Sequence, residues 1–116
     1  INYRIHTDAI KDILIPPDIP SAKISITYAN EADVLNMALF GITAKEWRTA
    51  NPNANGNIRD EASLQQLIVL TNLEALNAEF IRQGISQGDR LMRLNRSAKQ
   101  MMQSLLNNPS IKGLPE

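Results

Sequence analysis

The clearest hydrophobic pattern in the chain predicts an amphipathic helix over residues 87–106. Its apolar residues recur every three or four positions and fit within about 100° of a helical wheel. They are Leu91, Leu94, Ala98, Met101 and Leu105. Arg93, Arg96 and Lys99 lie on the opposite side of the wheel. We therefore expect this helix to bury one face, with Ser86 as its N-cap.

Residues 63–83 carry a second helical pattern, which differs from the first. The apolar residues between Leu64 and Ile81 fall at almost every angle of the wheel. A helix that is apolar all round is buried on all sides. We therefore expect 63–83 to be the central and most buried helix, with Leu67, Leu70 and Leu73 inside the core.

Capping signals fix the ends of these two helices. Ser63 and Gln66 have the spacing of a capping box. Gly84 tolerates the left-handed conformation that ends a helix. The link 84–86 is so short that the two long helices are expected to form an antiparallel hairpin.

Similar signals predict shorter helices nearer the N-terminus. Asn30 is a good N-cap for a helix over 31–40, which Gly41 ends. Thr43 and Glu46 form a capping box for a helix over 44–50. Residues 1–14 also have helical spacing, and the prolines at 16 and 17 end that segment.

Only one segment has the alternation of a β-strand. Residues 24–28 alternate apolar and polar side chains and are rich in β-branched residues. Residues 57–59 are the only partner that the sequence offers, so the fold contains at most a small two-stranded β element. The fold class is predicted as mainly α, with about five helices around 63–83. Residues 1–106 form a single helical domain and 107–116 a flexible tail.

Composition excludes several kinds of chemistry. The chain has 116 residues, no cysteine and one histidine, and it carries 12 basic and 12 acidic residues. The absence of cysteine excludes a disulfide framework, a thiol nucleophile and cysteine-ligated metal sites. No run of about 18 apolar residues and no signal peptide are visible, so we expect no membrane association and a cytoplasmic location. We expect no enzyme activity, no cofactor and no metal site.

Charge is distributed unevenly along the chain. Residues 1–40 carry three basic and five acidic groups, a net −2, and residues 41–81 repeat these numbers. Residues 82–116 carry six basic and two acidic groups, a net +4. Cations along one helix can neutralise phosphates, so this helix is a candidate nucleic-acid contact. The candidate residues are Arg90, Arg93, Arg96 and Lys99. The same residues are equally compatible with a solvated helix face.

Residues 31–50 have the proportions of a helix-turn-helix corner. Gly41 would start the turn and Trp47 would seat the second helix. That helix would present Lys45 and Arg48 outward, where they could contact phosphates and base edges. Any tight corner between two helices has this spacing, and a lone tryptophan usually anchors a core.

Several segments together resemble the region that follows the KilA-N domain in phage-derived and bacterial KilA-N proteins. They are residues 1–17, 28–48, 50–60 and 70–81, and the resemblance extends over about residues 1–106. Glu61 departs from it, because an aromatic residue is expected there. KilA-N proteins are regarded as DNA-binding proteins of phages, prophages and large DNA viruses.

The resemblance implies that a DNA-binding module precedes Ile1, in agreement with the missing initiator methionine. The expected function is that of a non-enzymatic accessory domain, which pairs or positions upstream DNA-binding modules. The complete protein would bind DNA. The alternative is direct nucleic-acid binding through helix 87–106 and the corner 31–50. A homodimer is also expected, with Ile1 and Ile5 as a docking site.

Overall fold

A computed structural model of the chain describes residues 15–28 and 30–107, and it confirms the mainly α fold class. The described elements are α2 (Ser21–Ile24), α3 (Glu31–Phe40), α4 (Ala44–Ala50), the 3-10 helix η1 (Ile58–Glu61), α5 (Leu64–Arg82) and α6 (Gln87–Leu106). The predictions of a helix over 1–14 and of a docking site at Ile1 and Ile5 lie outside the described residues, and so does the predicted tail 107–116 except for its first residue.

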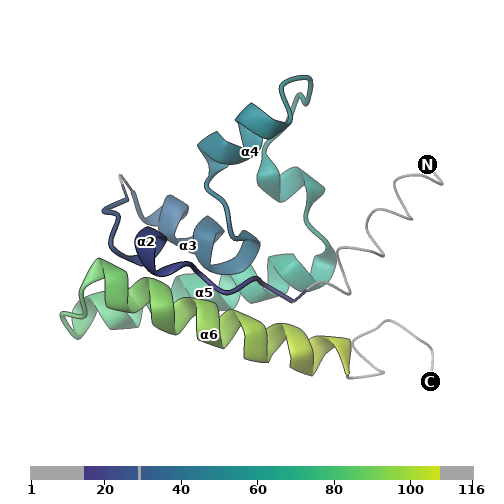
Figure 1. The fold of residues 1–116 in the computed structure, drawn as a ribbon. Coiled ribbons are helices and arrows are strands. Elements are labelled where there is room, and N and C mark those ends of the chain that lie inside the picture. The colour runs from purple at the N-terminus through teal and green to yellow at the C-terminus, as the bar shows by residue number, and fades with distance from the viewer. Residues whose placement is uncertain (1–14, 29, 108–116) are drawn as a thin grey trace.

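The core lies where α3, α5 and α6 pack against one another. Figure 1 shows α5 and α6 as two long antiparallel helices, with α3 packed above them and α4 projecting away. The buried apolar residues of the core cluster are Val34, Leu35, Met37, Ala38 and Leu39 of α3, Val69, Leu70 and Leu73 of α5, and Leu91, Leu94, Ala98 and Met102 of α6. The predicted hairpin is therefore confirmed.

The prediction that 63–83 is the most buried helix is wrong. Six of the ten residues of α3 are buried, against five of the nineteen in α5. Leu70 and Leu73 are buried as expected, but Leu67 is 39% exposed and Leu64 is 67% exposed. Among the described elements, α3 and α6 pack most extensively against α5, and Leu64 and Leu67 lie on a side of this helix that stays at the surface.

Helix α6 follows its predicted pattern closely. Leu91, Leu94 and Ala98 are fully buried, whereas Met101 and Leu105 are half-buried. Met102, the neighbour of the predicted stripe residue Met101, is fully buried instead. The helix therefore buries its N-terminal two thirds more deeply than its C-terminal end.

The predicted helix ends are confirmed by their hydrogen bonds. The Asn30 side chain accepts from the backbone N–H of Asp33 at 2.9 Å, and both bonds of the capping box are present at Thr43 and at Ser63. Gly41 and Gly84 have φ of 80° and 75°. At Gly84 the backbone N–H groups of residues 84 and 85 donate to carbonyls 81 and 80, as in a Schellman motif. Side-chain caps thus fix the residue at which α3, α4 and α5 each begin.

The two-stranded element is not formed within residues 15–28 and 30–107. Residues 21–24 form α2, and residues 58–61 form η1 under a capping box between Asn57 and Asp60. The backbone of Tyr28 is paired with a side chain: its N–H donates to Gln87 Oε1 at 2.9 Å, and its carbonyl accepts from Gln87 Nε2 at 3.3 Å. A glutamine of α6 therefore satisfies backbone groups that a second strand would otherwise pair.

Candidate functional site

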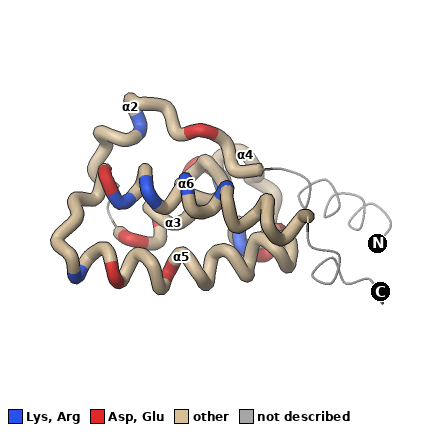
Figure 2. The backbone as a smooth tube through the Cα atoms, turned by 90° about the horizontal axis from the view of Figure 1, so that it is seen from below, with Lys and Arg blue, Asp and Glu red and all other residues tan. Residues whose placement is uncertain are grey.

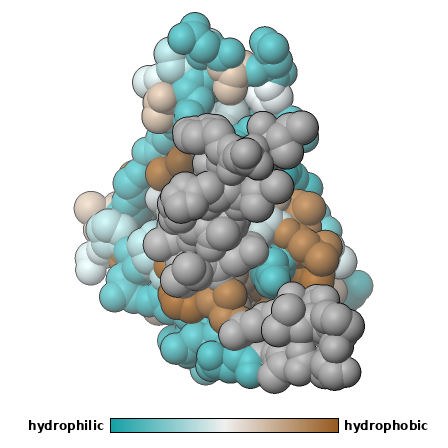
Figure 3. Space-filling view, turned by 90° about the vertical axis from the view of Figure 1, so that its right-hand side faces the viewer, coloured by the Kyte–Doolittle hydropathy of each residue, from teal (hydrophilic) through white to brown (hydrophobic). Residues whose placement is uncertain are grey.

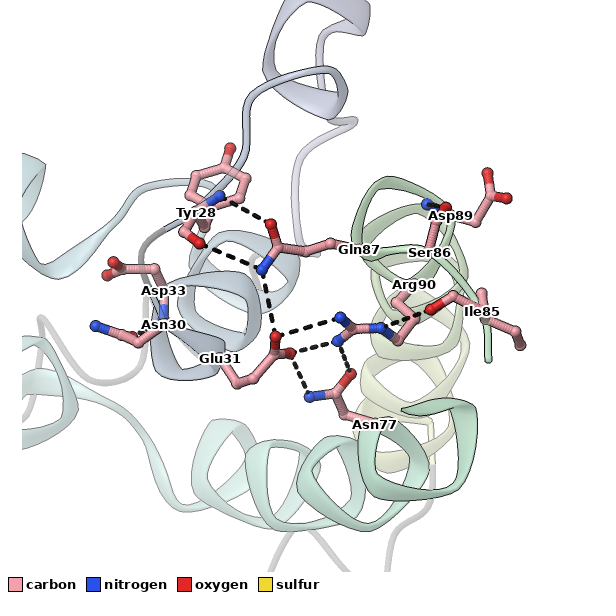
Figure 4. A network of polar contacts seen from close by, with 10 residues as sticks. All are labelled: Tyr28, Asn30, Glu31, Asp33, Asn77, Ile85, Ser86, Gln87, Asp89 and Arg90. Atoms are coloured by element: carbon pink, nitrogen blue, oxygen red, sulfur yellow. Dashed lines mark hydrogen bonds and ion pairs between the residues drawn. The ribbon is translucent and has the colours of Figure 1, made fainter. Parts of the chain in front are cut away.

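Arg90, one of the predicted phosphate-binding residues, lies inside the protein. Its side chain is 9% exposed and forms a two-pronged ion pair with Glu31. One Nη1–H also donates to Asn77 Oδ1 at 2.8 Å, and Nε–H donates to the Ile85 carbonyl at 3.0 Å (Figure 4). The guanidinium group is thus engaged by the fold, and Arg90 is not available for an external phosphate.

Glu31 is the acceptor at the centre of this network. Besides Arg90, it accepts from Asn77 Nδ2 at 2.9 Å and from Gln87 Nε2 at 3.3 Å. Figure 4 shows that the network joins the start of α3, the C-terminal third of α5 and the start of α6. The hydrogen bonds from Arg90, followed by those from Asn77 and Gln87, hold the pKa of Glu31 below its ordinary value despite partial burial. The network therefore connects α3, α5 and α6 through side-chain hydrogen bonds.

The lowered pKa of Glu31 predicts how stability depends on pH. A carboxylate with a depressed pKa stabilises the folded state above its unfolded pKa, and this contribution is lost as the pH falls through the folded pKa. We expect the difference in unfolding free energy between the wild type and Glu31→Gln to be constant near neutral pH. It should shrink as the pH falls below the ordinary value of 4.5. Urea unfolding of both proteins between pH 3 and 7 measures it; a difference that grows on acidification contradicts it.

The remaining cations of α6 are only partly free. Basic residues follow one another along this helix in Figure 2. Lys99 forms an ion pair with Asp18, and the Arg93 guanidinium carbon lies 5.9 Å from the centre of the Phe80 ring. Arg93 and Arg96 are exposed and form no ion pair with a described residue. Two of the four predicted cations are therefore bound within the fold.

Helix α4 presents the other predicted DNA contacts. Lys45 and Arg48 are exposed and form no ion pair within the described part of the chain. Trp47 is not part of the core: it lines a pocket of about 200 Å³ with Phe40 and Ile58, and α4 buries no residue. In Figure 1, α4 lies at the top and α6 at the bottom, with α3 between them. The two groups of cations therefore do not form one surface.

A third surface lies at the end of the molecule where α5 begins and α6 ends. On α5, Leu64 has both Leu67 and Ile68 as neighbours, since they lie three and four residues further along the helix. Ile68 lines a pocket of about 310 Å³ together with Met101 and Leu105 of α6. Figure 3 looks at this end of the molecule and shows several apolar patches on it. We call these five residues the end face.

The two stretches of chain that carry the end face contain no charged residue. Residues 62–73 and 100–107 include no Asp, Glu, Lys or Arg, although these types make up 21% of the chain. The polar residues that line its pocket are Asn72, Gln100 and Ser104. The hydrophobic pattern did not predict this face, because an apolar side chain in a helical pattern is normally assigned to the core. The signal that identifies it is the coincidence of two uncharged stretches at the same end of a hairpin.

Other site types find no support in residues 15–28 and 30–107. No three His, Cys, Asp or Glu side chains are grouped there as a metal site would need. None of the described helices has the length and apolar character to cross a membrane. The one histidine, His6, lies outside these ranges.

Comparisons with known proteins give no further assignment. No family model, no curated protein and no solved structure matches the chain.

Proposed function

We propose that the chain is a non-enzymatic interaction domain of a prophage-type DNA-binding protein similar to KilA-N proteins. In this proposal it acts in the cytoplasm and pairs or docks protein chains, so that DNA-binding modules are held in position. The observation that carries the proposal is the uncharged apolar end face. An uncharged patch in which two exposed leucines adjoin half-buried Ile, Met and Leu is typical of the centre of a protein–protein interface.

The position of the charged residues supports the same proposal. Arg90 is paired inside the fold and Lys99 is paired with Asp18 at the surface, which leaves Arg93 and Arg96 as the exposed, unpaired cations of the described helix α6. Affinity for nucleic acid depends on the number of phosphates that a protein neutralises. Two arginines on a chain of zero net charge provide little of this driving force.

The alternative function is direct nucleic-acid contact, and one observation favours it. Lys45, Arg48, Arg93 and Arg96 are all exposed, and each is free of ion pairs to the described residues. Arg93 and Arg96 would contact phosphates, whereas Lys45 and Arg48 would reach base edges from α4. The two functions differ in whether the chain by itself binds DNA.

A titration of fluorescent duplex DNA with the full chain distinguishes these functions. At low salt, about 50 mM, we expect no salt-dependent binding, and no difference between the wild type and the double variant Arg93→Gln, Arg96→Gln. Lys45→Ala with Arg48→Ala is the matched control for α4. Binding whose logarithmic salt slope becomes shallower by up to about two in the α6 variant would contradict the proposal and support direct contact. A loss of sequence preference in the α4 variant would also contradict the proposal, and it would indicate that α4 contacts base edges.

A further inference from the structure

We propose that the end face is the surface through which two copies of this chain pair around a two-fold axis. This inference rests on the proposed interaction function and names its partner. The face consists of Leu64, Leu67 and Ile68 on α5 with Met101 and Leu105 on α6. It has neighbouring apolar side chains on both helices, in contrast to isolated exposed residues such as Ile26.

The absence of charge is the argument for a second copy as the partner. In a two-fold interface each residue meets the same surface of the other subunit, so any charge near the axis opposes a like charge. Residues 62–73 and 100–107 contain none. Nucleic acid would need cations on this surface, and a strongly charged protein partner would need the complementary charge. A surface of Leu, Ile and Met surrounded by Asn, Gln and Ser is compatible with its own copy.

The shape of the face also fits a two-fold pair. Leu64 is 67% exposed and projects from the start of α5. One turn further along the same helix, Ile68 borders the recess of about 310 Å³ that Met101 and Leu105 complete. An isologous interface requires a projection and a recess on the same surface, because each subunit supplies both. The side chain of Leu64 from one copy and the recess of the other provide this pairing.

The size of the face indicates a weak pair. The ten helical residues 64–73 extend over about 15 Å, and two adjacent helices are about 20 Å wide, which gives roughly 300 Å² for each copy. Stable interfaces bury about 800 Å² for each partner. The pair should therefore form at high micromolar concentration and dissociate on dilution. When DNA-binding modules on neighbouring sites hold two chains close together, the effective concentration of the end faces rises, and even such a weak contact can form.

Charge substitution at Leu64 tests the proposal on the full chain. Sedimentation velocity between about 10 μM and 1 mM should show the wild-type mass rising from that of a 12.9 kDa monomer toward a dimer. Leu64→Glu and Leu64→Lys should each remain monomeric, since the charge would have to enter the apolar recess of the other copy. An equimolar mixture of the two variants should also stay monomeric, because each charge would meet an apolar recess and not the opposite charge. Ile81→Glu changes an exposed apolar residue at the other end of α5 and should behave as the wild type. Circular dichroism checks that each variant is folded.

Three results would overturn the inference. The first is a wild-type chain that stays monomeric to 1 mM. The second is pairing that survives Leu64→Glu and is lost in Ile81→Glu, which would place the contact elsewhere. The third is pairing that begins only after residues 108–116 are removed, which would mean that the chain's own C-terminal segment covers the face. The first two results leave an interaction function with a different partner or surface intact, whereas salt-dependent DNA binding would overturn that function itself.

Discussion

Replacing Glu31 by alanine should lower the free energy of unfolding by about 3 kcal/mol. The substitution leaves the guanidinium of Arg90, whose side chain is 9% exposed, without its carboxylate partner. Removing one partner of a buried ion pair costs about 3–5 kcal/mol, because the other charge stays desolvated. Glu31 is itself 40% exposed, which places the expected loss at the lower end of that range. Urea denaturation at pH 7 measures the change.

An exposed ion pair of the same chain is the matched control. Glu79 pairs with Arg82 at 3.1 Å, and both side chains are more than half exposed. Exposed pairs contribute about 0–1 kcal/mol, so Glu79→Ala should leave the unfolding free energy within about 1 kcal/mol of the wild type. If Glu31→Ala were as mild as Glu79→Ala, the network around Arg90 would not be what fastens α3 to α5 and α6.

The second large effect is expected in the core. Leu70→Ala should lower the free energy of unfolding by about 2–5 kcal/mol, because it leaves a cavity between helices that cannot fully close. Leu70 is buried among α3, α5 and α6 in the core cluster. Thermal and urea unfolding of the variant, followed by circular dichroism at 222 nm, give the change.

Leu64→Ala, on the same helix, is the control for this prediction. The side chain of Leu64 is largely in solvent, so its truncation should change stability by less than about 0.5 kcal/mol in the monomer. Measured at low protein concentration, equal losses for Leu64→Ala and Leu70→Ala would mean that α5 is buried on all sides. That result would restore the prediction of a central helix and remove the end face.

Local signals in the sequence were sufficient to predict most of the described fold. Asn30, Thr43, Ser63 and Ser86 each cap the helix that was predicted to follow, because a capping bond connects residues only two or three positions apart. Gly84 ends α5 for a similarly local reason. Helix ends are therefore predictable without knowledge of the tertiary structure.

Burial was less predictable, because it depends on which helices are neighbours. The wheel of 63–83 has apolar residues at every angle, and this pattern does not distinguish a buried side chain from one that is left for a partner. Leu67 and Leu70 look alike in the sequence, yet Leu70 belongs to the buried core cluster whereas Leu67 is 39% exposed. The predicted strand fails for a related reason: Gln87, 59 residues away, satisfies the backbone of Tyr28.

In the candidate sites, too, local spacing was predictable from the sequence, whereas contacts between distant residues were not. Arg90 lies four residues before Leu94 and eight before Ala98, so helical spacing places it on the buried side of α6. Its partner Glu31 is 59 residues away in sequence, and no spacing rule connects the two. The end face likewise needs the hairpin, since it joins residues 64–68 to residues 101–105. The charges counted along α6 therefore overestimated the number of cations that are available for a phosphate. They also gave no indication of the uncharged end face.

The most direct test of the proposed interaction function is a pair of titrations followed by NMR of the nitrogen-15-labelled chain. In the first, the protein concentration is raised; in the second, duplex DNA is added at low salt. We expect the first titration to shift amide signals within residues 62–73 and 100–107, and the second to leave the signals of Arg93 and Arg96 unchanged. Signals that shift with DNA along α6 or α4, and none that shift with protein concentration, would contradict the account.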